Sequence, residues 1–104
     1  KGLPWEIAKA FDGSAVVGKF IDIPADVQAI NFSLHKNNLL VQEGHTKDML
    51  FTIDHIIAYV SQFFSLHTGD LIFTGTPAGV GPVAIGDQLK GAIEQEPLFE
   101  IHIK

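Results

Sequence analysis

Apolar side chains recur at every second position along two stretches of the chain. In residues 28–34 (QAINFSL) they fall on Ile30, Phe32 and Leu34, and in residues 97–104 on Phe99, Ile101 and Ile103. A period of two is typical of a strand that packs one face on a core and turns the other to solvent. Both stretches are therefore predicted to be half-buried β-strands.

Four further strands are predicted from β-branched and apolar runs bounded by turn residues. They cover residues 15–22 (AVVGKFID), 39–43, 71–75 (LIFTG) and 85–94. Asn37 and Asn38 separate the second and third strands in chain order, and asparagine tolerates positive φ, so a tight hairpin is expected there.

Residues 52–64 (TIDHIIAYVSQFF) show the three-to-four spacing of an amphipathic helix. Thr52 is the expected N-cap, and Asp54 lies in the first turn, where the helix dipole favours a negative charge. Together these elements predict a mainly β (α+β) fold: a mixed, rolled β-sheet of about six strands with one amphipathic helix.

Composition and charge indicate a single globular domain and argue against nucleic-acid-binding, membrane-spanning and disulfide-bonded proteins. The 104 residues are 46% hydrophobic, enough for a single domain over residues 1–104. The net charge is −5 and no arginine is present, which argues against a nucleic-acid partner. No apolar run approaches the ~20 residues of a membrane span. Cysteine is absent, which excludes disulfides and thiolate metal sites and fits a cytoplasmic protein.

The chain opens KGLPWEIAKAFDG, without an initiator methionine. We therefore expect residues 1–104 to be the C-terminal part of a catalytic domain whose N-terminal part lies outside this chain.

The glycine-rich stretch FTGTPAGVG (73–81) follows a predicted strand directly. Glycine allows the main chain to approach a ligand closely, and successive N–H groups form a concavity that binds anions. Gly81 is followed by proline rather than Lys-Ser/Thr, so this is no P-loop, and no helix follows as a dinucleotide fingerprint requires. A sharp connection between strands explains the same residues equally well.

Lys9 is the other candidate for binding an anion, since it lies among apolar residues in WEIAKAF. It either pairs its ammonium with an anion or extends it to solvent. The five histidines and the scattered carboxylates show no metal-ligand spacing.

Three segments resemble, in order and spacing, the C-terminal half of the fumarylacetoacetate hydrolase superfamily. They are GLPWEIAKAFDGSAVVG, QEGHTKDMLFTIDHIIAYVS and GDLIFTGTPAGVGPVAIGDQL. The most specific part is G-D-x-x-x-T-G-T-P-x-G-V-G, and the resemblance covers nearly the whole chain. It is nearest to the small members, the acylpyruvase and oxaloacetate decarboxylase branch.

The resemblance implies a rolled, mainly β catalytic domain, a homodimer and a bound Mg²⁺ or Mn²⁺. It assigns Lys9 to catalysis and substrate binding, and Thr76, with Gly75 beside it, to the substrate carboxylate. The family's metal ligands, a Glu-x-Glu pair and an aspartate, would lie upstream of Lys1, so no metal ligand is expected in this chain.

The expected function is metal-dependent C–C bond cleavage, by hydrolysis or decarboxylation, of a small 2-oxo acid such as an acylpyruvate or oxaloacetate. Two alternatives stay open: isomerisation of an unsaturated 2-oxo diacid on the same fold, and a non-catalytic fragment or interaction module.

Overall fold

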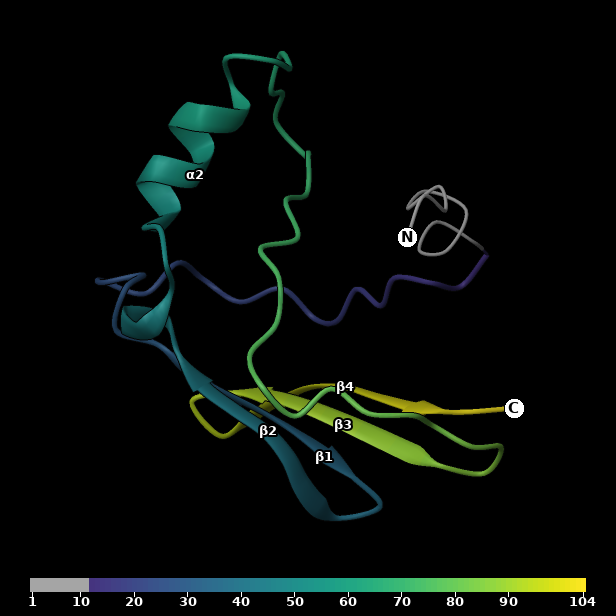
Figure 1. Ribbon diagram of the computed structural model, residues 1–104. Helices are drawn as coiled ribbons and strands as arrows, with labels where there is room; N and C mark the ends of the chain where they lie inside the picture. The colour runs from purple at the N-terminus through teal and green to yellow at the C-terminus, as the bar shows by residue number, and fades with distance from the viewer. Residues whose placement is uncertain (1–11) are drawn as a thin grey trace.

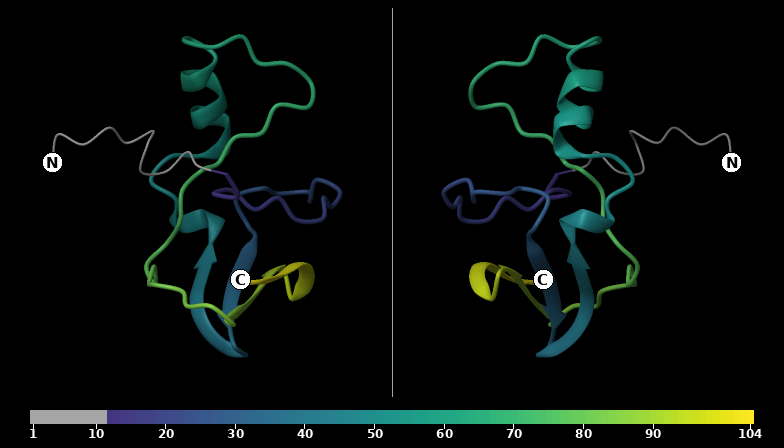
Figure 2. Two further views of the ribbon diagram at one scale, coloured as in Figure 1. Left: turned by 90° about the vertical axis from the view of Figure 1, so that its right-hand side faces the viewer. Right: turned by 90° about the vertical axis from the view of Figure 1, so that its left-hand side faces the viewer.

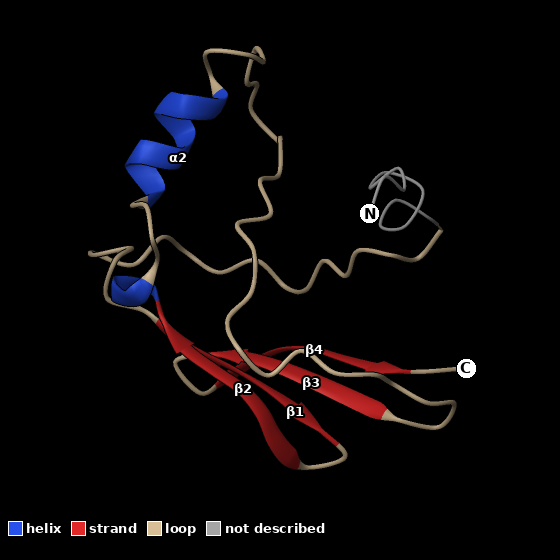
Figure 3. Ribbon diagram, in the orientation of Figure 1, coloured by secondary structure: helices blue, strands red, loops and turns tan. Residues whose placement is uncertain are grey.

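The structure is a computed structural model that describes residues 12–104. Four strands form one antiparallel sheet in the order β2-β1-β3-β4, and α2 lies between β2 and β3 along the chain (Figure 3). The elements are β1 (Asn31–Lys36), β2 (Leu39–His45), the 3-10 turn η1 (Thr46–Asp48), α2 (Ile53–Val60), β3 (Gln88–Ile93) and β4 (Glu96–His102).

The prediction of a mainly β fold with one amphipathic helix is confirmed for the described residues, but two of its details differ. The sheet has four strands rather than about six, and every pairing in it is antiparallel rather than mixed. The missing strands are the predicted ones at 15–22 and 71–75, which have no ladder partner within residues 12–104.

The predicted hairpin at Asn37–Asn38 is confirmed. Both residues have positive φ, 52° and 68°, as the tight turn between β1 and β2 requires. Asn37 also connects the turn to β3, because its backbone N–H donates to Gln88 O (2.9 Å) and its side-chain Oδ1 accepts from Gln88 N (2.9 Å). One asparagine thus sets the turn and links β1 to β3 across 51 residues.

The second hairpin, between β3 and β4, turns at Glu94 and Gln95, also at positive φ (51° and 69°). Neither residue type favours this conformation, so sequence gives no signal for the turn. Glu94 is tied in place, because its Oε1 accepts from the backbone N–H of Asn31 and its own N–H donates to Asn31 O (2.9 Å).

The predicted period-two alternation is confirmed in β4, where Phe99 and Ile101 are half-buried and Glu100 and His102 are exposed. Large rings on the inner face lie over glycines on the neighbouring strand. Phe32 in β1 lies opposite Gly44 in β2, and Phe99 in β4 lies opposite Gly91 in β3. A side chain on either glycine would overlap the ring.

Residues 15–22 were predicted to be a strand, and that prediction is wrong. The segment is extended but largely exposed, and Lys19 N–H to Leu98 O (2.8 Å) ties it to β4. Gly18 allows the close approach, since a Cβ there would meet the Leu98 carbonyl oxygen at 2.9 Å. This one backbone hydrogen bond is not enough to make the segment a strand paired with β4.

The helix begins as predicted, with Thr52 as N-cap: its hydroxyl accepts from His55 N–H (3.1 Å). It ends earlier than the predicted Phe64, at Val60, where the Ser61 hydroxyl donates to Ala58 O (2.8 Å) and competes with the helical pattern. Figures 1 and 2 show α2 standing clear of the sheet. α2 has eight residues, too few to cross a bilayer, and no other helix among the described residues is longer than α2.

Residues 71–75 were predicted to be a buried strand, which is also wrong. They form an exposed extended connection between the end of the helical region and β3, drawn in green in Figure 1. Leu71 and Phe73 are 52% and 65% exposed. Within residues 12–104 no large hydrophobic side chain is fully buried. The strands predicted to be buried or half-buried therefore keep their apolar side chains partly exposed to solvent.

Candidate functional site

The glycine-rich segment 73–81 contacts the middle of β2, at Val41 and Gln42, and it carries both candidate residues, Gly75 and Thr76. Gly75 has φ +98°, a conformation that L side chains rarely adopt, and Thr76 follows it with an exposed side chain. No backbone N–H of residues 71–83 donates a hydrogen bond to another residue of the described part of the chain. The turn therefore offers a hydroxyl and main-chain N–H groups, the donor set that suits a carboxylate.

Thr76 is held by Gln42, from the middle of β2. The Gln42 side-chain Nε2 donates to Thr76 Oγ1 (2.8 Å) and to the backbone oxygen of Pro77 (3.0 Å). Because Thr76 Oγ1 accepts this bond, its own hydroxyl hydrogen is available to another acceptor.

Gly79 provides the second point of attachment. A Cβ at this position would overlap the backbone oxygen of Val41 and would lie 3.0 Å from Cγ of Gln42. Gly79 also has φ +108°, so two independent features require glycine there. The segment thus rests directly on the β2 backbone.

An irregularity in β2 falls at the same place. Leu34 in β1 lies opposite Gln42, but the next residue, His35, lies opposite Leu40, so Val41 has no partner of its own in β1. Such a bulge bends a strand and redirects its side chains, and bulges are common beside active sites. Here it lies where the segment 73–81 contacts β2.

A hollow of about 950 Å³ opens between the inner face of the sheet and the segments that cross over it. Ligand sites are mostly apolar clefts of roughly this size with a few placed polar groups. Apolar side chains line most of this hollow, among them Phe32 and Phe99, while Gln42, Gly75 and Thr76 lie on its wall. The hollow therefore combines an apolar wall with the hydroxyl and main-chain N–H donors of the turn.

Of the three site residues predicted from sequence, Gly75 and Thr76 both line this hollow. Lys9 lies outside the described residues. Gln42 was not among the predicted residues, although it is a polar residue on the apolar inner side of β2, opposite Leu34. That mismatch is the signal that could have found it.

The metal ion implied by the family resemblance has no ligand set in residues 12–104. No three His, Asp or Glu side chains there come close enough together to hold a cation. His45 instead accepts from Lys47 N–H at its Nδ1 (3.0 Å) and caps η1. Residues 12–104 thus contain no such cluster of ligands.

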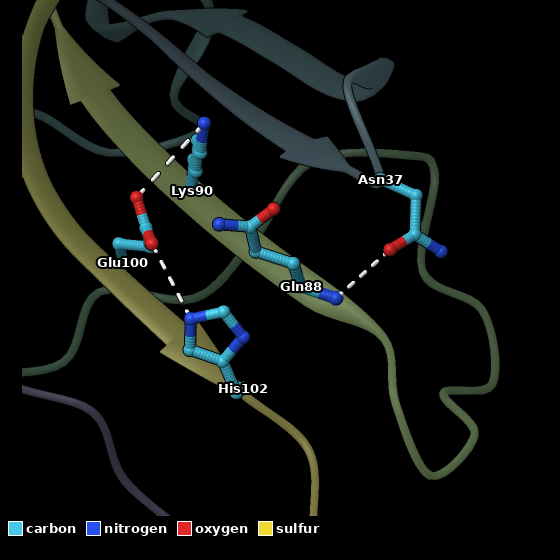
Figure 4. A network of polar contacts seen from close by, with 5 residues as sticks. All are labelled: Asn37, Gln88, Lys90, Glu100 and His102. Carbon is cyan, nitrogen blue, oxygen red and sulfur yellow. Dashed lines mark hydrogen bonds and ion pairs between the residues drawn. The ribbon is translucent and has the colours of Figure 1, made fainter.

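A second polar cluster, on the outer face of the sheet, does not belong to the site. Glu100 lies between Lys90 (3.9 Å) and His102 (3.3 Å), with Gln88 beside them (Figure 4). The Gln88 side chain and then the neighbouring positive charges lower the pKa of Glu100. None of these four residues lines the hollow, and exposed ion pairs of this kind contribute little stability.

Comparison with known proteins identifies the family. The model of the fumarylacetoacetate (FAA) hydrolase C-terminal region matches residues 1–104. The mitochondrial oxaloacetate tautomerase FAHD1 of Mus musculus is 46% identical over 97 residues, which cover 90% of this chain and 43% of that protein. The chain therefore spans a little under half the length of this relative.

Solved structures agree. A protein from Yersinia pestis CO92 described as of the fumarylacetoacetate hydrolase family superposes with a TM-score of 0.91 at 43% identity, covering 99% of this chain and 48% of that one. A maleylpyruvate hydrolase from Sphingobium sp. SYK-6, in complex with manganese(II) and pyruvate, gives 0.69 at 36% identity over 78% of this chain and 30% of that one.

The chain thus belongs to the fumarylacetoacetate hydrolase family, as the Thr-Gly-Thr-Pro segment and its surroundings predicted.

Proposed function

We propose that the protein containing this chain is an enzyme that forms an enolate from a small 2-oxo acid of the oxaloacetate or acylpyruvate type. The observation that carries the proposal is the Thr76 hydroxyl, fixed by Gln42 on the wall of an apolar hollow. The names of the relatives, an oxaloacetate tautomerase and a maleylpyruvate hydrolase, support this substrate class.

In this proposal the substrate carboxylate accepts hydrogen bonds from Thr76 Oγ1 and from main-chain N–H groups near Gly75. These bonds orient the 2-oxo acid so that the bond to be broken faces the rest of the active site. Phe32 and Phe99 also line the hollow and would provide an apolar wall for the rest of the substrate. Lys9, which the family resemblance assigns to catalysis, would stabilise the negative charge that develops on the keto oxygen.

Three reactions share this enolate. Loss of a C3 proton followed by protonation of the keto oxygen is tautomerisation. Loss of CO₂ is decarboxylation, and attack of water on a distal carbonyl releases the enolate in hydrolysis. The tautomerase name of the 46% identical relative favours the first. C–C cleavage, the reaction expected from sequence, is the second candidate and is supported by the hydrolase neighbour.

Dependence on a divalent metal is part of the proposal, supported by the manganese in the hydrolase structure. The ion supplies Lewis-acid polarisation of the 2-oxo acid when bound. Its identity, Mg²⁺ or Mn²⁺, the expected homodimer and the cytoplasmic location also stay predictions. Many apolar side chains near α2, such as Phe63 and Phe64, are exposed. Such exposure supports their being covered by another protein surface in the whole protein.

The test uses the full-length protein with oxaloacetate and acylpyruvates, with Mg²⁺ or Mn²⁺ and after chelation. Conversion between enol and keto forms, CO₂ release and acid release are followed separately. Thr76→Val should raise KM about 10- to 100-fold, the loss of one hydrogen bond to a charged group. Thr76→Ser, which keeps the hydroxyl, is the matched control and should stay near wild type.

Lys9→Ala should lower kcat by at least about 100-fold, since it removes charge stabilisation of the enolate. Near-normal kcat/KM in both Thr76→Val and Lys9→Ala would remove the basis for the proposed site.

A further inference from the structure

We propose that Gln42 is a positioning residue of the carboxylate site: its amide sets the direction in which the Thr76 hydroxyl donates. This inference rests on the proposed function, since it concerns the same carboxylate. It adds a residue from a different element, 34 positions away along the chain, to the site.

The orientation of the Gln42 amide follows from its partners. The backbone oxygen of Pro77 can only accept a hydrogen bond, so the atom that faces it at 3.0 Å is Nε2 rather than Oε1. The second N–H of the same group then reaches Thr76 Oγ1 at 2.8 Å. Both donors of the side chain are thus committed to the turn, and neither is available to a substrate.

The Thr76 hydroxyl is left with one role. Its oxygen accepts a hydrogen bond from Gln42 Nε2, and this amide nitrogen cannot accept one in return. The hydroxyl hydrogen of Thr76 therefore points toward a different acceptor. A carboxylate on the wall of the hollow is such an acceptor. Gln42 therefore turns a hydroxyl that can donate or accept into one that donates toward the substrate.

The backbone holds Gln42 in place for this task. The bulge at Val41 changes the register of β2 directly before Gln42, and the contact of Gly79 with the Val41 carbonyl brings the turn down on it. Gln42 is half-buried, and its hydrogen bond to the Pro77 oxygen is partly buried, whereas its bond to Thr76 Oγ1 is exposed, as the donor face of a substrate site would be.

A purely structural clamp is the competing explanation, and substitutions at position 42 separate the two. Gln42→Leu keeps the side-chain size and removes both donors. Gln42→Glu replaces the donor with a carboxylate, which would accept the Thr76 hydrogen and repel the substrate carboxylate. If Gln42 orients the hydroxyl, Gln42→Glu is more damaging to substrate binding than Gln42→Leu. A clamp alone would show the same order, because the new carboxylate repels the substrate in either case. The deciding comparison is therefore Gln42→Leu in a Thr76→Val background, where a clamp that also holds the main-chain N–H groups of the turn would still raise KM.

The experiment is a double-mutant cycle in the full-length protein, with KM and kcat for oxaloacetate and with calorimetric binding of pyruvate in the presence of Mn²⁺. We expect Gln42→Leu to raise KM and the pyruvate Kd about 10-fold with kcat within about 3-fold, and Gln42→Glu to raise them about 100-fold. In a Thr76→Val background, Gln42→Leu should add less than about 2-fold, since the two residues act through one hydroxyl.

Gln28→Leu is the matched control. The Gln28 amide also bridges two backbone groups, Thr46 O (3.0 Å) and Ile53 N–H (2.8 Å), but it lies outside the hollow. It should lower the melting temperature and leave KM unchanged. Thermal unfolding of every variant identifies those that are folded, and Gln42→Asn provides a further variant at position 42 if Gln42→Leu is not.

Two results would overturn the inference while leaving the proposed function intact: Thr76→Val impairs binding but Gln42→Leu and Gln42→Glu do not, or the effects at positions 42 and 76 multiply independently. Unchanged pyruvate binding in Thr76→Val is a different result. It contradicts the proposed carboxylate site itself, and this inference with it.

Discussion

The four-stranded sheet and the segment 71–83 have similar apolar composition but are held in different ways. In the sheet, each strand pairs along its length, and the pairings β1–β2, β1–β3 and β3–β4 support one another. The segment 71–83 has no ladder within residues 12–104. It is tied to the sheet by the Gln42 amide, by the contact of Gly79 with Val41 and by Lys36 Nζ to Pro82 O (3.2 Å).

Because the two regions are held differently, we expect mutations in the sheet to change mainly stability and mutations in the segment 71–83 to change mainly function. A ladder spreads its free energy over many bonds, so one substitution in the sheet changes stability gradually. The segment depends on a few contacts between residues far apart in sequence. A single substitution there should therefore move the candidate site while most of the fold survives.

Substitution of Gly79 should have the largest effect. Gly79→Ala places a Cβ against the Val41 carbonyl at a positive φ, so the segment must lift from β2. We expect kcat/KM in the full-length protein to fall on the order of 100-fold or more, because a small misplacement of binding groups is costly. Gly81→Ala is the matched control, since nothing lies within 4 Å of its Cβ. Equal activity of the two variants would contradict this account of the segment.

Substitution of Gly91 tests the sheet. Gly91→Ala pushes a methyl group into the Phe99 ring on the opposite strand and should lower the free energy of unfolding by about 1–3 kcal/mol. Chemical denaturation measures it. The double variant Gly91→Ala/Phe99→Leu makes room for the methyl and should recover part of the loss. If the double variant is less stable than Gly91→Ala alone, contact of the new methyl group with the Phe99 ring is not the cause of the destabilisation.

Relief of the strained β3–β4 turn should stabilise the sheet by a smaller amount. Gln95 has φ 69°, and Gln95→Gly removes the steric cost of that conformation, roughly 1 kcal/mol. The Glu94 bond to Asn31 is kept by leaving Glu94 unchanged. A rise in melting temperature with unaltered KM is expected. A lower melting temperature would mean that the flexibility gained by the unfolded chain dominates.

The smallest effect concerns Asp87, where the segment joins β3. Hydrogen bonds from Ala84 N–H and the Asn37 side chain lower the pKa of Asp87. A carboxyl with a lowered folded-state pKa contributes stability above its unfolded pKa, and that contribution is lost as the pH falls through the folded value. Wild type should therefore exceed Asp87→Asn in stability at pH 7 and lose this advantage below about pH 4. A difference that stays constant between pH 7 and pH 3 would rule out the charge as its origin.

Local patterns predicted much of the sheet. Asn37–Asn38 reads as a tight turn because both residues tolerate positive φ, and the Thr52 cap reads as a helix start because its hydroxyl needs only the adjacent N–H groups. The predicted strand at 71–75 fails for the opposite reason. Apolar β-branched residues fit a strand, but a strand also needs a partner, and none within residues 12–104 lies beside it.

The candidate site divides in the same way. The residue types in Thr-Gly-Thr-Pro already indicated an anion-binding turn, and their order indicated the family, because such chemistry is carried by neighbouring residues. Only the tertiary structure joined Gln42 to Thr76, placed the bulge at Val41 under Gly79 and set Glu94–Gln95 at positive φ. Local preference acts over a few residues, whereas these features arise when strands from distant parts of the chain pack and impose a conformation that no neighbouring residue selects.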